Sequence, residues 1–400
     1  MIVTGWTYPG DTTTEIIDVI DGETCTDLAD FPMEIGYSVG ANLQGTPIVC
    51  GGWINGNGDS DNCYQFLDDA WQEFATMNRA RDFAAGIIYD KKFHIFGGND
   101  GSAKKSTEIL SADGVVIDGP VLPTGVSFHT ITSINATLSI LSGGGQYDAN
   151  ADISYSLDQT WYYNHATQEF KPGPTLLEKR NLHTSATIID KITKANIPVI
   201  SGGVKKAGDS SNSYVILDST EFLIHGEWQA GELLTKKKYC WFCLPRKRHS
   251  YLFFLFLMLG PPMPKRATRH AMVEIQGDLF VFGGLDKPNS RQTAIHKLEC
   301  SSNNCSWSTI NQQMQAAKRD VVAIAVPNWF CKTTATTTST TTLLTTTTTR
   351  TITTTTTGTT TTSTTSTTTT NEISSKKIST SLTLLYFGTN LNITFTALTE

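Results

Sequence analysis

Short hydrophobic runs that end in a pair of glycines recur along the chain. They read PIVCGG, FHIFGG, SILSGG, PVISGG and LFVFGG, and they end at Gly52, Gly98, Gly144, Gly203 and Gly284. A degenerate copy, MIVTGW, opens the chain with Trp6 in place of the second glycine. The leading glycines Gly5, Gly51, Gly97 and Gly143 are spaced by 46 residues. A fixed period of this length predicts a repeat architecture, and the β-branched runs predict strands.

Each repeat predicts four strands. The strand from Ala84 to Tyr89 turns at Asp90-Lys91 into the run that ends in Gly-Gly, a third strand follows over Ser106 to Leu110, and a fourth comes next. One such antiparallel sheet cannot bury both of its faces, but sheets stacked radially can, as in a propeller. The glycine pairs predict a sharp bend with positive φ at a crowded place near the centre.

The order of parts in each repeat resembles that of kelch repeats: a hydrophobic run, Gly-Gly, a later Tyr or Phe, a Trp, and a Pro- and Leu-rich turn with Arg. The turns DGPVLP, KPGPTLLEKR and PPMPKR resemble the connections between kelch blades. The resemblance covers residues 2–326 apart from 235–261. It implies an all-β fold, a six-bladed kelch-type β-propeller of four-stranded antiparallel blades over residues 1–331. Kelch propellers serve as adaptors, scaffolds and, rarely, enzymes.

The two ends of the repeat region predict how the propeller closes. The chain begins at the second strand of a blade, with Ile2 to Thr4, and Val321 to Val326 has the pattern of a first strand. We expect these two segments to pair, so that the last strand completes the first blade. The alternative is that upstream sequence is missing, because Met1 stands directly against strand residues and no signal peptide precedes it.

Three segments depart from the pattern. Residues 235–261 combine a basic run with about ten apolar residues, too few to span a membrane. Cys240 and Cys243 within it could be half of a zinc site, but no second pair with suitable spacing follows. We interpret 235–261 as a retained intron or an added loop that protrudes between blades. Residues 332–370 predict a disordered, threonine-rich, mucin-like stalk, and 371–400 a disordered tail without a membrane span.

Charge and cysteines indicate the compartment and the class of partner. The formal net charge is -6, which argues against nucleic acid. We expect disulfides Cys50–Cys63 and Cys300–Cys305 across neighbouring strands, and a third between Cys25 and Cys331 is open. Candidate N-glycosylation sites are Asn135, Asn304 and Asn392. Together these features predict a secreted or surface-associated glycoprotein.

Candidate binding residues precede the first strand of several blades. They are Arg81, Arg180, His183, Arg266, His270 and Arg319. We expect them at the rim of the central channel; the alternative is that they pair with neighbouring blades or with backbone carbonyls. No two histidines have metal-ligand spacing, and no nucleophile motif is present, so we expect no metal site, no cofactor and no catalytic residue.

The function predicted from the sequence is a non-enzymatic binding module that recognises a protein or glycan partner through its blade loops. Two alternatives stay open. An intracellular kelch adaptor would recruit substrates to a ligase, and such adaptors usually carry a helical region ahead of the propeller. A copper-radical oxidase would need two Tyr and two His that converge at the axis.

Overall fold

A computed structural model describes residues 2–6, 12–20, 24–25, 28–148, 153–190, 194–206, 213–230, 261–301 and 304–326. Within these ranges all regular structure is β, so no helix there could cross a membrane. The threonine-rich segment 332–370, the tail 371–400 and the segment 235–261, apart from Pro261, lie outside the described residues. The predictions for those segments therefore stay predictions.

Four antiparallel sheets have four strands each, and they follow one another along the chain. The first contains β5 (Val39–Leu43), β6 (Thr46–Cys50), β9 (Asn62–Leu67) and β10 (Ala70–Thr76). The second contains β11 (Ala85–Tyr89), β12 (Lys92–Phe96), β13 (Thr107–Leu110) and β14 (Val116–Asp118). The third contains β15 (Thr130–Ser133), β16 (Leu138–Ser142), β19 (Thr160–Asn164) and β20 (Glu169–Pro172). The fourth contains β21 (Thr184–Ile189), β22 (Asn196–Ser201), β25 (Thr220–Ile224) and β26 (Glu227–Ala230).

A larger sheet joins the two ends of the repeat region. It contains β27 (Ala271–Ile275), β28 (Asp278–Phe282), β30 (Ser290–Ser301), β31 (Asn304–Ile324), β1 (Ile2–Trp6), β2 (Glu15–Ile17) and β3 (Thr24–Cys25), with β29 (Leu285–Lys287) against β30. Ile2 is opposite Ile324 and Thr4 is opposite Val322, which confirms the predicted closure. The last strand is not the separate element that we expected. Residues 304–324 contain neither Gly nor Pro, and they form one continuous strand.

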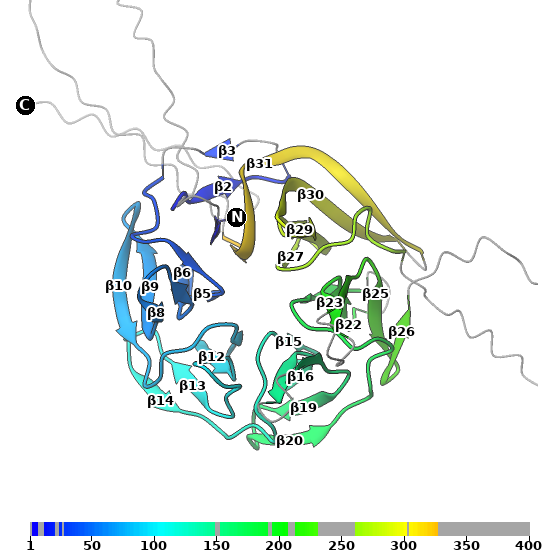
Figure 1. Cartoon of the computed structure of the whole chain (residues 1–400), viewed down its shortest axis with the longest axis horizontal. Helices are drawn as coiled ribbons and strands as arrows, with labels where there is room; N and C mark the ends of the chain where they lie inside the picture. Colours follow the sequence, from blue (N-terminus) through cyan, green and yellow to red (C-terminus); the bar gives the residue numbers. More distant parts are fainter. Residues whose placement is uncertain are drawn as a thin grey trace, which may run out of the picture. The chain divides into compact units, whose positions relative to one another are not determined.

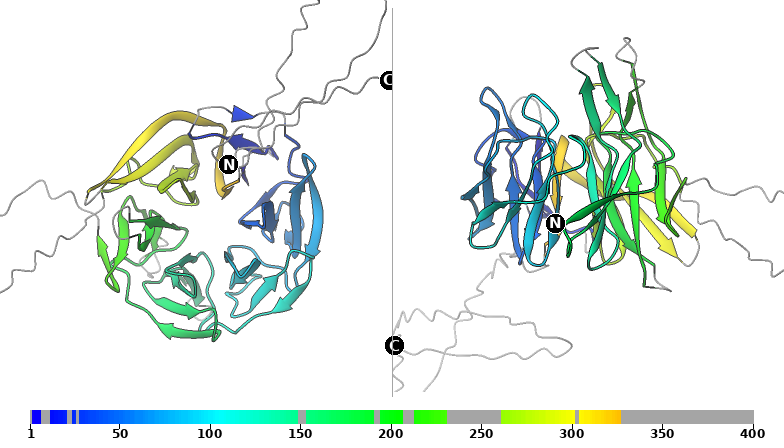
Figure 2. Two further views of the ribbon diagram at one scale, coloured as in Figure 1. Left: turned by 180° about the vertical axis from the view of Figure 1, so that it is seen from behind. Right: turned by 90° about the horizontal axis from the view of Figure 1, so that it is seen from below.

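Small sheets form beside the glycine pairs, each with a short hairpin that follows the pair. They are β4 (Ile35–Gly36) with β7 (Trp53–Ile54) and β8 (Gly58–Asp59), β17 (Gly145–Asp148) with β18 (Ile153–Ser156), and β23 (Val204–Lys206) with β24 (Tyr214–Ile216). The sheets surround a central axis, with the N-terminus beside β31 (Figure 1). In the side view, the green hairpins rise from one face of this ring (Figure 2). We call it the hairpin face.

The hydrophobic core lies between neighbouring sheets, because successive side chains of a strand point to opposite faces. In β12, Phe93 and Ile95 pack with residues of the first sheet, whereas Phe96 packs with residues of the third. Each of these three side chains is at most 1% exposed. A sheet with two buried faces is therefore stable only between two neighbours, which explains why the repeats close into a ring.

The glycine pairs are required where neighbouring sheets touch. Gly97 has a φ of 60°, and a Cβ there would lie 2.5 Å from the carbonyl oxygen of Val126 in the next sheet. Gly98 has a φ of 97°, and its Cβ would lie 2.6 Å from the carbonyl oxygen of Asp82. The Gly98 N–H donates to the same Val126 carbonyl at 3.0 Å. Positive φ and close backbone approach at these glycines are confirmed.

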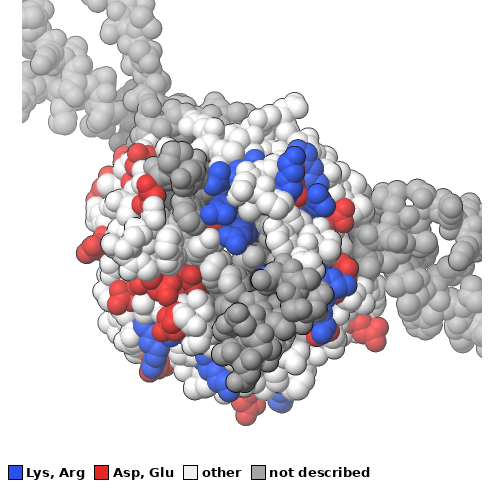
Figure 3. All heavy atoms as spheres, in the orientation of Figure 1, with Lys and Arg blue, Asp and Glu red and all other residues white. Residues whose placement is uncertain are grey.

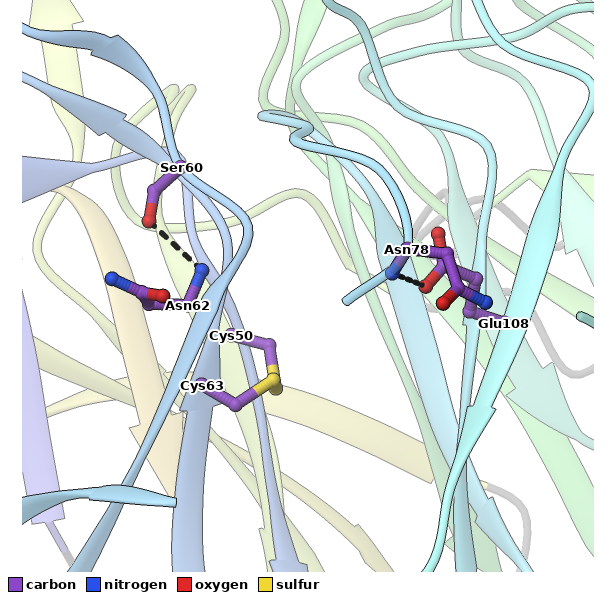
Figure 4. Close-up of a disulfide and its surroundings, with 6 residues drawn as sticks. All are labelled: Cys50, Ser60, Asn62, Cys63, Asn78 and Glu108. Carbon is purple, nitrogen blue, oxygen red and sulfur yellow. Dashed lines mark hydrogen bonds between the residues drawn. A yellow bond between two sulfur atoms is a disulfide. The ribbon is translucent and has the colours of Figure 1, made fainter. Parts of the chain in front are cut away.

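Both predicted disulfides are present. Cys50 and Cys63 are directly opposite on β6 and β9, with their Cα atoms 4.0 Å apart (Figure 4). Cys300 and Cys305 bridge the hairpin of β30 and β31, with a Cα separation of 4.1 Å. These separations are shorter than the 4.4 to 6.8 Å usual for disulfides. Cys331, the proposed partner of Cys25, lies outside the described residues.

Candidate functional site

Six non-glycine residues in the left-handed conformation surround the axis, one just before each innermost strand segment. They are Tyr37, Phe83, Phe128, Leu182, Arg269 and Asp320, with φ between 49° and 63°. We call them the axial ring. From Phe83 onward, the N–H of each member donates to the carbonyl of the preceding member at 2.8 to 3.1 Å. This chain of hydrogen bonds holds a conformation that costs roughly 1 kcal/mol or more per residue.

The side chains of the axial ring divide it into an apolar part and a charged part. Phe83 lies between Tyr37 and Phe128, with centroid distances of 3.9 Å on both sides and ring planes tilted by 33° and 48°. Arg269 donates to the Tyr37 hydroxyl at 2.7 Å and lies 3.4 Å from the Asp320 carboxylate. Burial raises the pKa of Asp320 to about 6, although Arg269 and Arg319 oppose the rise. The ring therefore offers an aromatic surface next to a guanidinium group.

A cavity of about 640 Å³ opens on the hairpin-face side of the axial ring. Phe128, Leu182 and Arg269 belong both to it and to a smaller cavity along the axis, so they separate the two. Its further lining includes Asn99, Gln146, Tyr155, Asn181, Lys206, Tyr214, Asn289 and Arg319. The described lining contains three cationic side chains and no Asp or Glu. This lining suits a ligand with an anionic group and additional hydrogen-bonding groups.

Hydrogen bonds fix one wall of this cavity, which we call the hairpin-face cavity. The amide of Gln146 donates to the Thr124 hydroxyl at 2.7 Å and to the Gly125 carbonyl at 2.8 Å. Its oxygen accepts from the Tyr155 hydroxyl at 2.9 Å. The wall therefore has a preformed arrangement of polar groups.

Charges are unevenly distributed on this face. In the orientation of Figure 1, acidic side chains gather on the side of β8 to β10, whereas basic side chains gather near the axis and over β29 and β30 (Figure 3). The pKa of the buried Asp82 on the acidic side is raised to about 7, first by burial and then by the charge of Asp59. A ligand in the cavity thus meets positive charge on one side only.

Two of the predicted binding residues, Arg81 and Arg180, lie inside the sheets and not at the rim. Arg180 is fully buried, and its guanidinium donates to the Gly202 carbonyl at 2.8 Å and to Glu221 at 2.6 Å. Arg81 makes the equivalent contacts with the Gly97 carbonyl and Glu108. The prediction that they lie at the rim of the central channel is therefore wrong for these two residues. The alternative, that they pair with backbone carbonyls or neighbouring groups, applies to both.

His183 and His270 line the axial cavity of about 220 Å³, but they are buried. Burial lowers the pKa of His270 to about 3, and that of His183 falls well below its usual value for the same reason. A Cβ on Gly143 would lie 2.8 Å from the ring of His183, and one on Gly202 would lie 2.7 Å from that of His270. The two histidines therefore pack neutral against glycines of the preceding sheet.

Arg266 and Arg319 have different surroundings. Arg266 is exposed and does not line either central cavity. Arg319 lines the hairpin-face cavity, and its Nε lies 3.4 Å from Asp320. Of the six predicted residues, Arg319 is thus the one that lines the hairpin-face cavity. Within the described part of the chain, no group of three or more His, Cys, Asp or Glu residues is arranged to hold a metal.

The sequence interpretation missed Arg269, Asp320 and Lys206. Arg269 lies 14 residues before Gly283, as Phe83 does before Gly97, so aligning the repeats on the glycine pairs would have shown a polar residue at an apolar position. No glycine pair follows Asp320, so the same alignment would not have marked it. Lys206 lies on β23, directly after a glycine pair. No repeat signal marks it, because the small hairpins differ in length between repeats.

Comparisons with known proteins agree with the fold. No protein-family model and no curated protein matches this sequence. Among solved structures, the chain is similar to the one titled "Structure of YjhT", with a TM-score of 0.60 and 10% sequence identity. The alignment covers 76% of this chain and 93% of that one. At this identity the likeness shows a shared fold, a propeller-like ring of antiparallel sheets, and nothing about function.

Proposed function

We propose that this chain is a six-bladed, kelch-type propeller that acts outside the cell as a binding module, without catalysis. Its partner is a protein or glycan that places an anionic group in the hairpin-face cavity. The threonine-rich segment 332–370 serves as its stalk. The two disulfides support an oxidising compartment.

The observation that carries this proposal is the cationic lining of the cavity in an acidic protein. Arg269, Arg319 and Lys206 line it, and the described residues of its lining include no Asp or Glu, whereas the whole chain has a formal net charge of -6. Asp320 lies near both arginines and offsets part of their charge. The remaining positive charge favours an anion, because charge-assisted hydrogen bonds are stronger than neutral ones.

The cavity also has the size and the apolar surface of a ligand site. Its volume of about 640 Å³ is typical of sites for small ligands or for a single inserted group. Phe128 and Leu182 form an apolar floor, and Tyr214 and Ile216 extend this surface along β24. A carboxylated sugar or an acidic side chain could bind the cations and pack its carbon atoms on this floor.

Binding of the full-length protein to two acidic probes tests the proposal. The probes are an oligoglutamate peptide and a carboxylated oligosaccharide, each compared with its amidated, neutral form. We expect at least one acidic probe to bind more tightly than its neutral form, and added salt to weaken the binding. Arg319→Gln and Lys206→Gln should each weaken it about tenfold, which corresponds to 1.4 kcal/mol.

Lys171→Gln is the matched control, because Lys171 is exposed on β20 and lies outside the cavity lining. It removes the same charge and should leave the affinity unchanged. Equal weakening by all three variants would mean that only the net charge matters. Equal affinity for acidic and neutral probes would contradict the proposal.

A further inference from the structure

A third cavity, of about 390 Å³, lies between the second and third sheets. Ile87, Ile88, Tyr89 and Asp90 line it from the hairpin of β11 and β12, and Ser133, Asn135, Ala136, Ser139 and His165 line it from the third sheet. The innermost strands start next to the axial ring and run away from it, so Tyr89 and Ser133 lie at the far ends of β11 and β15. This cavity therefore faces away from the hairpin-face cavity.

Asn135 belongs both to this cavity and to the sequon Asn135-Ala136-Thr137. Its side chain is exposed, and its Oδ1 accepts hydrogen bonds from the Thr137 N–H at 3.0 Å, the Thr137 hydroxyl at 3.3 Å and the Leu138 N–H at 3.0 Å. The three hydrogen bonds engage Oδ1 and leave Nδ2, the nitrogen that a glycan modifies, outside them. The turn thus presents a fixed and accessible acceptor amide.

The walls of the cavity match the two kinds of surface on a sugar ring. Tyr89 stacks on His165 of the neighbouring sheet with a centroid distance of 4.1 Å and an angle of 15°. Ile88, 36% exposed, extends this apolar wall. Asp90, from the hairpin of β11 and β12, and Ser133, from the third sheet, add polar groups to the lining. Sugars present C–H groups on one face and hydroxyls at the edge, so they bind where apolar and polar walls meet.

We propose that Asn135 carries an N-linked glycan whose first N-acetylglucosamine residue lies in this cavity. Asn135 Nδ2 attacks C1 of a lipid-pyrophosphate-linked oligosaccharide; the C1–N bond forms, the C1–O bond to the pyrophosphate breaks, and Nδ2 loses a proton as the lipid pyrophosphate leaves. The glycan occupies the face opposite the hairpin-face cavity and leaves that cavity open. This inference rests on the extracellular location in the proposed function.

The other sequons differ from Asn135 in their surroundings. Asn304 is followed by Cys305, which is bonded to Cys300 and 5% exposed. Asn392 lies outside the described residues. Asn135 is therefore the sequon that the described structure places at the edge of a cavity.

The test uses the full chain behind a cleavable secretion leader in a eukaryotic cell that adds N-glycans. Mass spectrometry of the product should find a glycan at Asn135. An endoglycosidase that leaves one N-acetylglucosamine should not change the melting temperature, whereas an amidase that removes the whole glycan should lower it by about 2 °C. The amidase converts Asn135 to Asp, so Asn135→Asp made without a glycan is the control for that change and should melt at the lower temperature.

Two variants locate the sugar. Tyr89→Leu should abolish the 2 °C difference between the form with one sugar and the form with none, because it removes the stacked wall. Tyr214→Leu, an equal loss of aromatic surface on the hairpin face, should keep it. If the Tyr89 variant does not fold, Ile88→Ser takes its place, because it removes the exposed apolar side chain of the same wall and should likewise abolish the difference.

Several outcomes would overturn the inference. A bare Asn135 in a product whose Cys300 and Cys305 are bonded would refute glycosylation and leave the extracellular location intact. Free cysteines at 300 and 305 together with unmodified sequons would refute the location itself. A glycan whose complete removal leaves the melting temperature unchanged would refute its place in the cavity.

Discussion

Two kinds of repeat alternate around the axis, and they differ at the residue two positions before each member of the axial ring, which we call the anchor. In chain order the anchors are Ile35, Arg81, Val126, Arg180, Ala267 and Lys318. The three basic anchors are buried and pair with Glu108, Glu221 and Glu15. The other three are apolar and pack without charge. The anchor position is thus filled in two ways, by a buried ion pair or by an apolar side chain.

The glutamates show what the ionic anchors add. Glu221 accepts hydrogen bonds from the N–H groups of Leu177 at 2.9 Å and Glu178 at 3.2 Å, in the segment that enters the sheet. Glu15 does the same for Gln315 and Ala316, and Glu108 for Asn78 (Figure 4). Each ion pair therefore fixes the incoming chain to the third strand of its sheet. An apolar anchor excludes water but cannot orient these N–H groups.

The largest expected effect comes from breaking one ion pair. Arg180→Met leaves Glu221 buried without its cation, and we expect the free energy of unfolding to fall by about 3 to 5 kcal/mol. Val126→Ala, at an apolar anchor, should cost about 2 kcal/mol or less. Denaturant unfolding followed by tryptophan fluorescence measures both.

A double variant separates charge from packing. Arg180→Met with Glu221→Gln keeps an acceptor for the loop N–H groups and removes the unpaired charge, so it should recover more than half of the loss. A double variant that loses the sum of its two single variants would contradict this account, because the pair would then contribute no coupling.

The repeat made the sheets predictable from the sequence. Gly97 and its equivalents mark positions where a Cβ would collide with the backbone of the next sheet, so the spacing of the glycines gives the spacing of the sheets. Cys50 and Cys63 could be paired for a similar reason, because directly opposite strand positions follow from the hairpin.

The site was harder to predict. Arg180 and Arg319 both lie just before an innermost strand, but one points into its own sheet and the other lines the hairpin-face cavity. A shift of one residue along the chain decides between these two environments. The anchor lies two positions before the ring residue, whereas Arg319 lies one position before it. The sequence shows basic residues near this point, and the exact register around positive-φ residues such as Arg269 needs the fold.

Substituting a residue of a glycine pair should lower the free energy of unfolding by less than breaking an ion pair does, but by more than substituting a glycine in an ordinary turn. Gly143→Ala places a Cβ 2.7 Å from the Arg180 carbonyl oxygen at a φ of 59°, and we expect it to cost about 2 to 3 kcal/mol. Gly226→Ala also has a positive φ, 82°, but its Cβ would meet nothing within 4 Å. It should cost about 1 kcal/mol. Equal melting temperatures for the two variants would show that contact between sheets does not constrain Gly143.

The smallest expected effect concerns a difference between the second and fourth sheets, which both have an ionic anchor. Asp82 follows Arg81, and Asn181 follows Arg180 at the equivalent position; each makes the same pair of backbone hydrogen bonds, to Asn99 and to Val204. Burial and then the charge of Asp59 raise the pKa of Asp82 to about 7. The folded protein therefore holds a proton there that the unfolded chain, with a pKa near 3.9, releases earlier. Stability from this group is greatest below about pH 4 and is lost as the pH rises toward 7.

Asp82→Asn makes the second sheet like the fourth and removes this loss. We expect it to stabilise the protein by about 1 to 2 kcal/mol at pH 8 and by almost nothing at pH 4. Thermal unfolding of both proteins between pH 4 and pH 8 measures the difference. Asp113→Asn is the control, because the Ser111 hydroxyl lowers the pKa of that exposed carboxyl, so its replacement should bring no gain at high pH. A gain from Asp82→Asn that does not change with pH would mean that hydrogen bonding to Asn99, and not the buried charge, separates the two sheets.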